Sequence, residues 1–148
     1  MIYRENTLSY DDYYRLRESV AWLNFSREQT EKALNNSLYT VIAEDDGKVV
    51  GMGRMTGDGL YYLIVDIVVQ PDHQKKGIGS TIIDMMIDYV DRETPIGGRS
   101  SVQLTAEKGK ETFYEKRDRV SHLINWGDNS DGKCLLSSHE KLSSYSQH

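Results

Sequence analysis

A chain of 148 residues with 38% hydrophobic and 28% charged residues fits one globular domain with its own core and excludes a disordered chain. Its 18 Lys and Arg against 23 Asp and Glu give a formal net charge of −5, which would repel a polyanion such as nucleic acid. The single cysteine, Cys134, excludes an internal disulfide, and no Cys or His pair has metal-ligand spacing. Because no run of about 18 apolar residues and no export signal occur, we expect a cytoplasmic protein without a metal, a membrane span or a nucleic-acid partner.

The first part of the chain predicts a short strand followed by two helices. Residues 2–4 fit the strand, and Ser9 precedes residues 11–20, in which apolar side chains recur at helical spacing. Ser26 has a Gln three places on, as in a capping box, so a second helix is predicted to run to about residue 35.

The middle of the chain predicts antiparallel strands joined by short turns. Residues 38–43 and 49–55 are rich in β-forming side chains, and the Asp-Asp-Gly sequence at residues 45–47 supplies a hairpin turn. A Gly-Asp-Gly turn then leads into residues 60–69, an aromatic and β-branched run interrupted only by Asp66. Such a run predicts a strand that is buried on both faces.

A helix follows this strand after a proline and a glycine-bearing loop. One face of the predicted helix carries Ile78, Ile82, Met85, Met86, Tyr89 and Val90. Beyond a loop at residues 95–98, residues 101–104 predict a buried strand and residues 110–116 a short helix. The predicted fold class is therefore α/β, with a central mixed sheet flanked by helices, antiparallel in its first half and with a crossover in its second.

The loop between the long strand and the helix has the composition of a phosphate site. Gly77 and Gly79 stand where the helix begins, and a helix N-terminus offers unpaired backbone N–H groups and a partial positive charge. Lys75 and Lys76 add positive charge, and Ser80 adds a hydroxyl donor. A solvated surface turn is the alternative interpretation of these residues alone. Their spacing matches neither a P-loop nor the three-glycine dinucleotide-binding turn.

Residues 67–79, Ile-Val-Val-Gln-Pro-Asp-His-Gln-Lys-Lys-Gly-Ile-Gly, resemble the signature of GNAT acetyltransferases, and the order of elements is similar over residues 38–116. The resemblance implies the GNAT-type acyl-CoA N-acyltransferase fold, with acetyl-CoA as cosubstrate. The pyrophosphate of acetyl-CoA would then lie against the backbone of Gln74, Lys75, Lys76, Gly77, Ile78, Gly79 and Ser80. The backbone of Ile67, Val68 and Val69 would pair with the pantetheine arm as a further strand would, and an amide N–H there would polarise the thioester carbonyl.

Residues 113–116, Phe-Tyr-Glu-Lys, resemble the first half of the Tyr-Glu-Lys-x-Gly-Phe stretch of the same family. The resemblance implies Tyr114 as the catalytic acid, because a phenol with a pKa of about 10 can protonate a thiolate whose thiol has a pKa near 8.5. A tyrosine that packs its helix against the sheet is the alternative. Glu107 stands where the family often has Asn, so the resemblance does not imply the usual contact to CoA from that position.

Two further groups are weaker candidates for the acceptor side. Asp66, the only charge in the long strand, is predicted either as a catalytic base or amine-orienting anion, or as an acid that faces solvent or caps a neighbour. Aromatic side chains gather in the first two helices and could hold a cationic amine, although core packing is the favoured interpretation. They are Tyr10, Tyr13, Tyr14, Trp22 and Phe25.

The pattern breaks after Lys116, where the expected Gly-Phe is absent and apolar residues thin out. We therefore predict a GNAT-like domain over residues 1–116 and an atypical segment over residues 117–148, in which no element is predicted and residues 126–132 look turn-like. We hypothesise that this segment comes from a shifted reading frame. If neither other frame of the gene encodes a Gly-Phe followed by a strand-like segment, that hypothesis fails.

The function predicted from these residues is direct acetyl transfer from acetyl-CoA to a primary amine of a small molecule or a protein. Acidic net charge would favour cationic acceptors. The alternative is a non-catalytic CoA-binding regulatory or interaction module. The oligomeric state is left open, with a homodimer as one alternative.

Overall fold

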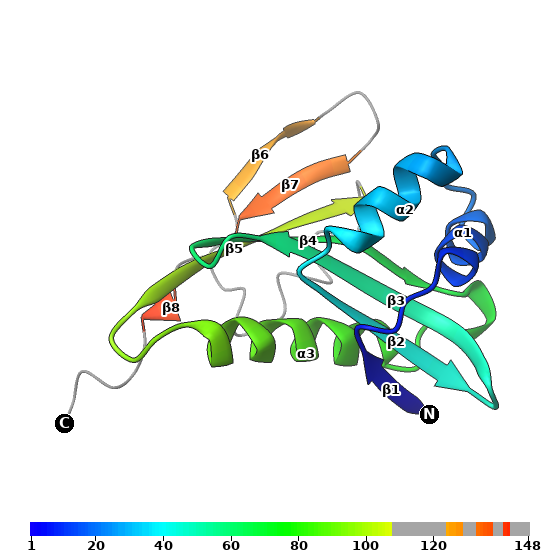
Figure 1. Cartoon of the computed structure of the whole chain (residues 1–148), viewed down its shortest axis with the longest axis horizontal. Coiled ribbons are helices and arrows are strands. Elements are labelled where there is room, and N and C mark those ends of the chain that lie inside the picture. Colours follow the sequence, from blue (N-terminus) through cyan, green and yellow to red (C-terminus); the bar gives the residue numbers. More distant parts are fainter. Residues whose placement is uncertain (108–123, 129–132, 138–140, 143–148) are drawn as a thin grey trace. The chain divides into compact units, whose positions relative to one another are not determined.

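The computed structural model describes the backbone of residues 1–107, 124–128, 133–137 and 141–142, and the side chains of residues 1–104 (Figure 1). The elements in chain order are β1 (Ile2–Glu5), α1 (Tyr10–Ser19), α2 (Arg27–Asn35), β2 (Tyr39–Asp45), β3 (Lys48–Gly57), β4 (Tyr61–Val69), the 3₁₀ turn η1 (Pro71–His73), α3 (Ile78–Glu93), β5 (Arg99–Glu107), β6 (Ile124–Asp128), β7 (Lys133–Ser137) and β8 (Lys141–Leu142). They form two compact units. The first contains Met1–Thr56 and Asp66–Met86, and the second contains Gly57–Val65 and Ile87–His148.

The first unit begins with three antiparallel strands. β1 pairs with β2, and β2 pairs with β3 from Tyr39 opposite Met55 to Asp45 opposite Lys48. The hairpin between β2 and β3 turns through Asp46 and Gly47, at φ values of 51° and 78°. Two consecutive left-handed residues are typical of the tight turns whose twist matches that of the flanking strands. The hairpin predicted from the sequence is therefore confirmed.

Two serine caps begin the helices of the first unit. Ser9 accepts a hydrogen bond from the backbone N–H of Asp12, and Ser26 accepts one from that of Gln29, at 3.1 and 3.2 Å. Each bond satisfies one N–H that the helix itself leaves unpaired. Both helices predicted from these serines are present. A buried cluster holds α1 against the sheet: Tyr13, Leu16, Ile42, Val49, Met52 and Val68.

The N-terminal half of α3 packs closely against β3 in the first unit. A Cβ added at Gly53 would lie 2.6 Å from Ile82 and 2.8 Å from Met86. The missing side chain lets the helix approach the strand more closely than alanine would. Because α3 begins immediately after the glycine-bearing loop, this packing fixes the position of the loop.

The second unit contains the first residues of β4 and the strands after α3. β4 pairs in parallel with β5 from Tyr61 opposite Ser101 to Ile64 opposite Leu104. β5 pairs with β7 and β7 with β6, both antiparallel, and β8 pairs with Arg99 and Ser100 of β5. The sheet is thus mixed, and α3 is the crossover between the parallel strands, as predicted.

The burial of β4 differs from the prediction. Tyr62, Ile64, Asp66 and Val68 are buried, while the residues between them are half-buried. The side chains on one face of β4, Asp66 among them, are therefore buried, and those on the other face are half-buried although they are apolar. β5 likewise has half-buried residues at 101–103, where a buried strand was expected.

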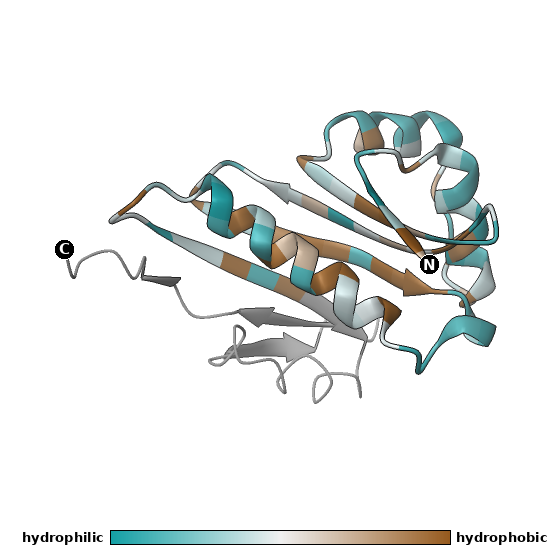
Figure 2. Ribbon diagram, turned by 90° about the horizontal axis from the view of Figure 1, so that it is seen from below, coloured by the Kyte–Doolittle hydropathy of each residue, from teal (hydrophilic) through white to brown (hydrophobic). Residues whose placement is uncertain are grey.

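The apolar face of α3 also differs from the predicted one. Figure 2 shows hydrophobic and hydrophilic residues alternating along this helix. Ile83 and Ile87 are buried, whereas Met85 and Tyr89 are only half-buried. The buried positions Ile78, Ile82, Ile83, Met86, Ile87 and Val90 follow the i, i+4 and i+5 spacing of a wide stripe. The predicted stripe was therefore placed too far to one side.

The prediction of no elements after residue 116 is wrong. Ile124–Asp128 and Lys133–Ser137 are strands, so Trp126, Gly127 and Asp128 belong to β6 and not to a turn. Backbone hydrogen bonds of β7 with β5 and of β6 with β7 form ladders regardless of side-chain pattern, which explains why periodicity did not reveal these strands. The predicted helix at residues 110–116 lies outside the described residues. The domain boundary and the reading-frame hypothesis stay predictions.

Candidate functional site

The glycine-bearing loop connects β4 to α3 within the first unit. After η1, Lys75 and Gly77 adopt left-handed backbone at φ values of 64° and 82°. A Cβ at Gly77 would meet nothing within 4 Å, so glycine is favoured here by conformation and the backbone is open to approach. Residues 74–77 are exposed, while Ile78 is buried and anchors the first turn of α3.

Hydrogen bonds fix this loop at both ends. The side-chain amide of Gln74 donates from Nε2 to the carbonyl of Val69 at 2.9 Å, which ties the loop to the last residue of β4. The backbone N–H of Gln70 donates to the Val50 carbonyl at 2.8 Å. At the helix end, both the N–H and the hydroxyl of Thr81 donate to the Gly77 carbonyl at 3.0 Å. These hydrogen bonds therefore hold both ends of the loop.

The electrostatics of the loop favour an anion at the start of α3. No acidic residue lies in the first turn of this helix, so its partial positive charge is not neutralised there. Lys75 and Lys76 are exposed beside it. These features together make a site at which backbone N–H groups can hold phosphate oxygens.

His73 is occupied by two carboxylates. Its Nδ1 lies 2.8 Å from Oδ1 of Asp72, and its Nε2 lies 3.0 Å from Oδ2 of Asp45. These hydrogen bonds, first that of Asp72 and then that of Asp45, raise the pKa of His73 above its ordinary value. The positive charge available in the loop therefore comes from Lys75 and Lys76, because both ring nitrogens of His73 are engaged.

Asp66 lies at the centre of a buried polar cluster. Its Oδ1 accepts from Arg17 Nη1 at 2.7 Å, and its Oδ2 accepts from the Tyr13 hydroxyl at 2.8 Å and from Arg54 Nε at 3.0 Å. Only 8% of Asp66 is exposed, so the alternative of a solvent-facing acid is wrong. Burial, and then the charge and hydrogen bond of Asp66, raise the pKa of Tyr13 to about 12. Tyr13 is thus a proton donor to Asp66 over the whole physiological range.

Aromatic side chains of α1 and of the connection between α1 and α2 surround an arginine of the protein itself, so Trp22 and Phe25 lie outside the helices in which they were predicted. The Arg17 guanidinium carbon lies 5.5 Å from the Tyr13 ring and 5.2 Å from each of the Trp22 and Phe25 rings. Arg17 Nη2 also donates to the Leu23 carbonyl at 2.5 Å. In the same way the Arg27 guanidinium carbon lies 4.5 Å from the ring of Tyr10. The cation–π contacts of these rings are therefore made by arginines.

Arg17 and Arg54 were not singled out in the sequence, although a signal for each exists. Arg17 follows Tyr13 by four residues and Leu16 by one, so it lies on the apolar stripe of α1. Arg54 lies two residues after the buried Met52 on β3, where alternate residues share a face. A charged residue on a buried face must find a partner, and Asp66 is the partner of both.

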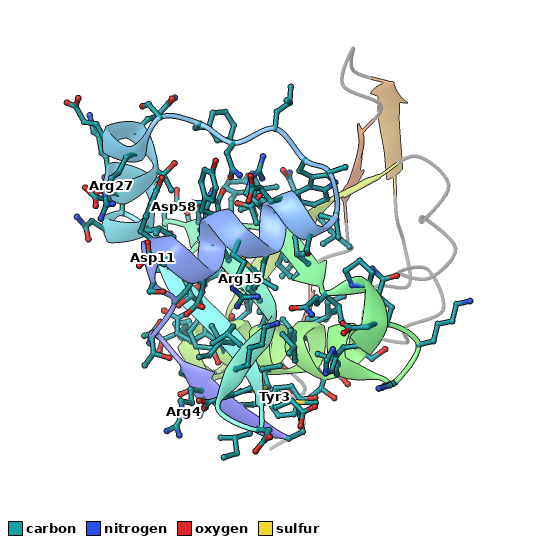
Figure 3. The ribbon with its side chains drawn as sticks, turned by 90° about the vertical axis from the view of Figure 1, so that its right-hand side faces the viewer. Tyr3, Arg4, Asp11, Arg15, Arg27 and Asp58 are labelled. Carbon is teal, nitrogen blue, oxygen red and sulfur yellow. The ribbon has the colours of Figure 1, made fainter. Side chains whose placement is uncertain are left out.

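Arg15 links α1 to the end of β4. Figure 3 shows this side chain projecting from α1. Its Nη1 donates to Oε1 of Gln70 at 3.1 Å, and its Nη2 donates to the Val49 carbonyl at 2.6 Å. α1 is therefore tied to the strand on which the loop begins.

Of the residues predicted to bind acetyl-CoA, the first unit brings together Ile67, Val68 and Val69 of β4 with residues 74–80 of the loop and α3. The side chain of Val68 is buried and those of Ile67 and Val69 are half-buried. Tyr114 lies outside the described residues, as does the side chain of Glu107. In the part of the chain whose side chains are described, no group of three or more His, Cys, Asp or Glu residues is arranged to hold a metal ion.

Comparison with known families decides the relationship that this strand, loop and helix suggest. Residues 2–118 match the model of the acetyltransferase (GNAT) family. The chain belongs to the GNAT family. The family and the mixed α/β fold class predicted from the sequence are thus confirmed. The match ends close to Lys116, after which the family pattern was not recognised.

The GNAT relatives include an uncharacterized N-acetyltransferase, ycf52, from Pyropia yezoensis, which is 34% identical over 107 residues. That alignment covers 69% of this chain and 59% of the relative, so the chain spans less than two thirds of the relative's length. Among solved structures, a probable acetyltransferase of unknown function from meticillin-resistant Staphylococcus aureus is 31% identical, with a TM-score of 0.66 over 78% of this chain and 87% of that one.

A more distant GNAT structure bears on the fold alone. The PaiA N-acetyltransferase from Thermoplasma acidophilum, solved in complex with coenzyme A, is 17% identical, with a TM-score of 0.63 over 93% of this chain and 99% of that one. None of the helices in the described residues is long and apolar enough to span a membrane.

Proposed function

We propose that this GNAT chain transfers the acetyl group of acetyl-CoA to a primary amine of a small molecule or a protein. The observation that carries the proposal is the prearranged loop at the start of α3. It combines an open left-handed Gly77, two exposed lysines and a first helical turn without an acid. The coenzyme A bound by the PaiA relative supports the same ligand here.

The phosphate end of acetyl-CoA would be held by the loop. Backbone N–H groups of residues 74–80 would donate to the pyrophosphate, and Lys75 and Lys76 would add charge. Phosphates bound in this way need backbone that they can approach, and the space beside Gly77 provides it. The residue set therefore fits the cosubstrate.

The pantetheine arm would lie along the last residues of β4. The register of β4 with β5 covers Tyr61–Ile64, and Ile67, Val68 and Val69 lie beyond it. Backbone groups beyond a ladder are suited to pairing with an extended ligand as with another strand. One amide N–H of this segment would then polarise the thioester carbonyl.

The chemical step needs a nucleophile and a proton donor. The neutral amine attacks the thioester carbonyl, the carbon–sulfur bond breaks, and the departing thiolate receives a proton, which we assign to the Tyr114 hydroxyl. The attacking nitrogen loses its proton to solvent or to a general base near the thioester. We propose no covalent acetyl-enzyme. Tyr114→Phe should lower kcat while the affinity for acetyl-CoA stays nearly unchanged.

A CoA-binding module without catalysis is the second function that the same loop supports. Calorimetric titration with CoA and an assay of free-thiol release from acetyl-CoA across a panel of amines separate the two. Amine-dependent thiol release supports the enzyme. CoA binding without thiol release supports the binding module, and absence of CoA binding contradicts both.

A further inference from the structure

Asp66 has a backbone conformation that is rare inside a strand. Its φ is +55°, in the left-handed region that a residue with a side chain seldom occupies. It is the sixth residue of β4, and buried positions continue on both sides of it. A strained conformation of this kind persists only where surrounding contacts fix it, and such positions concentrate at functional sites.

Three donors from two other elements fix the Asp66 carboxylate. Tyr13 and Arg17 come from α1, and Arg54 comes from β3. The side chains of Arg17 and Asp66 are 6% and 7% exposed, and that of Arg54 is 14% exposed. Arg17 is itself enclosed by three rings, and its Nε is buried without a hydrogen-bond partner. Its position is therefore set by its hydrogen bonds to Asp66 and to the Leu23 carbonyl and by packing.

The hydrogen bonds that the Asp66 carboxylate accepts distinguish between a general base and a positioning residue. A general base needs an accessible lone pair within reach of the proton that it removes. Both Asp66 oxygens already accept hydrogen bonds. Of the three bonds, two come from guanidinium groups and one from the Tyr13 hydroxyl. This geometry favours holding Asp66 in place over proton transfer from an amine.

The residues that follow Asp66 are those assigned to the pantetheine arm. Hydrogen bonds hold the side chain of Asp66 in place. Its left-handed backbone conformation is therefore fixed as well, and so is the direction of the strand after it. A left-handed residue inside a strand turns the next N–H and C=O groups away from the direction that a regular strand would give them, as in a β-bulge. Ile67, Val68 and Val69 thus follow directly from a fixed point.

We propose that the buried cluster of Arg17, Arg54 and Asp66 positions the backbone of β4 that binds acetyl-CoA, with Asp66 as a positioning residue and not the general base. The proposal names residues for the function proposed above and rests on it. It predicts that loosening the cluster harms cosubstrate binding even when the carboxylate remains.

Arg54→Met is the sharpest variant because it keeps the Asp66 carboxylate and removes one of its donors. Arg54→Lys restores the charge, and Arg27→Met removes an exposed arginine of α2 as a matched control. The first readout is amide hydrogen exchange at Ile67, Val68 and Val69 in the ligand-free protein. The second is the dissociation constant for CoA, with kcat and its pH profile as the third.

We expect Arg54→Met to speed exchange at these three amides and to raise the CoA dissociation constant, each by about tenfold or more. Arg54→Lys should recover part of both effects, and Arg27→Met should resemble the wild type. The shape of the pH profile should not change. Because Arg54→Lys is the milder change, it decides the question if Arg54→Met does not fold.

Unchanged exchange and CoA affinity in the Arg54 variants would overturn the proposal. So would an Asp66→Asn variant that binds CoA normally but loses the acidic limb of its pH profile, because that is the behaviour of a base. If the wild type binds no CoA, the proposed function fails. The exchange measurement still tests the cluster in that case, and normal exchange in both Arg54 variants would refute its effect on β4.

Discussion

The Arg17 guanidinium donates from Nη1 to Oδ1 of Asp66 over 2.7 Å, and both side chains are more than nine-tenths buried. Two charges in such a place are each costly unless the other is present. With Arg54 also on the carboxylate, the cluster holds two cations and one anion. Removal of either Arg17 or Asp66 would therefore leave an uncompensated charge in the core and lower the stability of the fold.

Asp66→Leu leaves the buried guanidinium of Arg17 and the partly buried guanidinium of Arg54 without their carboxylate. We expect the free energy of unfolding to fall by about 3–5 kcal/mol, as for other broken buried ion pairs. Urea unfolding followed by circular dichroism measures it. Glu31→Leu, which breaks the exposed pair with Arg27, is the control and should change stability by less than about 1 kcal/mol. Equal losses in the two variants would show that the Asp66 contacts contribute little.

The titration of His73 tests the contacts at the base of the loop. Hydrogen bonds that His73 donates to the carboxylates of Asp72 and Asp45 raise its pKa above the ordinary value of 6.5. The stability that this histidine contributes is therefore full below pH 6.5 and is lost as the pH rises through the raised pKa. NMR titration should show the raised value, and Asp72→Asn and Asp45→Asn should each lower it. A wild-type pKa of 6.5 or less would contradict these contacts.

Gly53→Ala tests the packing of α3 on β3. The new methyl group would lie 2.6 Å from Ile82 and 2.8 Å from both Ile67 and Met86. Ile67 Cδ1 and Met86 Cε are side-chain ends that can shift, but Ile82 Cγ2 is attached directly to Cβ, so we expect an overpacking loss of about 1–3 kcal/mol. At Gly51 the nearest atom, of Ile78, is 3.0 Å away, so Gly51→Ala should cost less. Urea unfolding that ranks the two in the opposite order would show that α3 does not lie as described.

Local signals explain why much of the first 104 residues could be predicted. Ser9 and Ser26 cap their helices as their side chains suggest. The Asp46-Gly47 turn needs left-handed backbone, which these residues tolerate. The strand, proline, glycine loop and helix that carry the family resemblance also follow one another without a break in the chain.

Long-range pairing explains what could not be predicted. Aspartate tolerates left-handed backbone, but no turn signal in the local sequence places such a residue at Asp66 inside a strand. Its conformation depends on arginines from α1 and β3. β6 and β7 are strands through their pairing with each other and with β5. The sequences of β6 and β7 show no alternation of apolar and polar residues that would predict a strand, although Cys134, Leu135 and Leu136 form a short apolar run.

Calorimetric titration with CoA and with pantetheine, which lacks the pyrophosphate, tests the role of the loop most directly. The wild type should bind CoA at least about tenfold more tightly than pantetheine. Gly77→Ala, which strains a left-handed residue of the loop, should reduce that preference, while Gly97→Ala, at nearly the same φ between α3 and β5, should keep it. Equal affinity for the two ligands, or no binding of CoA, would contradict the account.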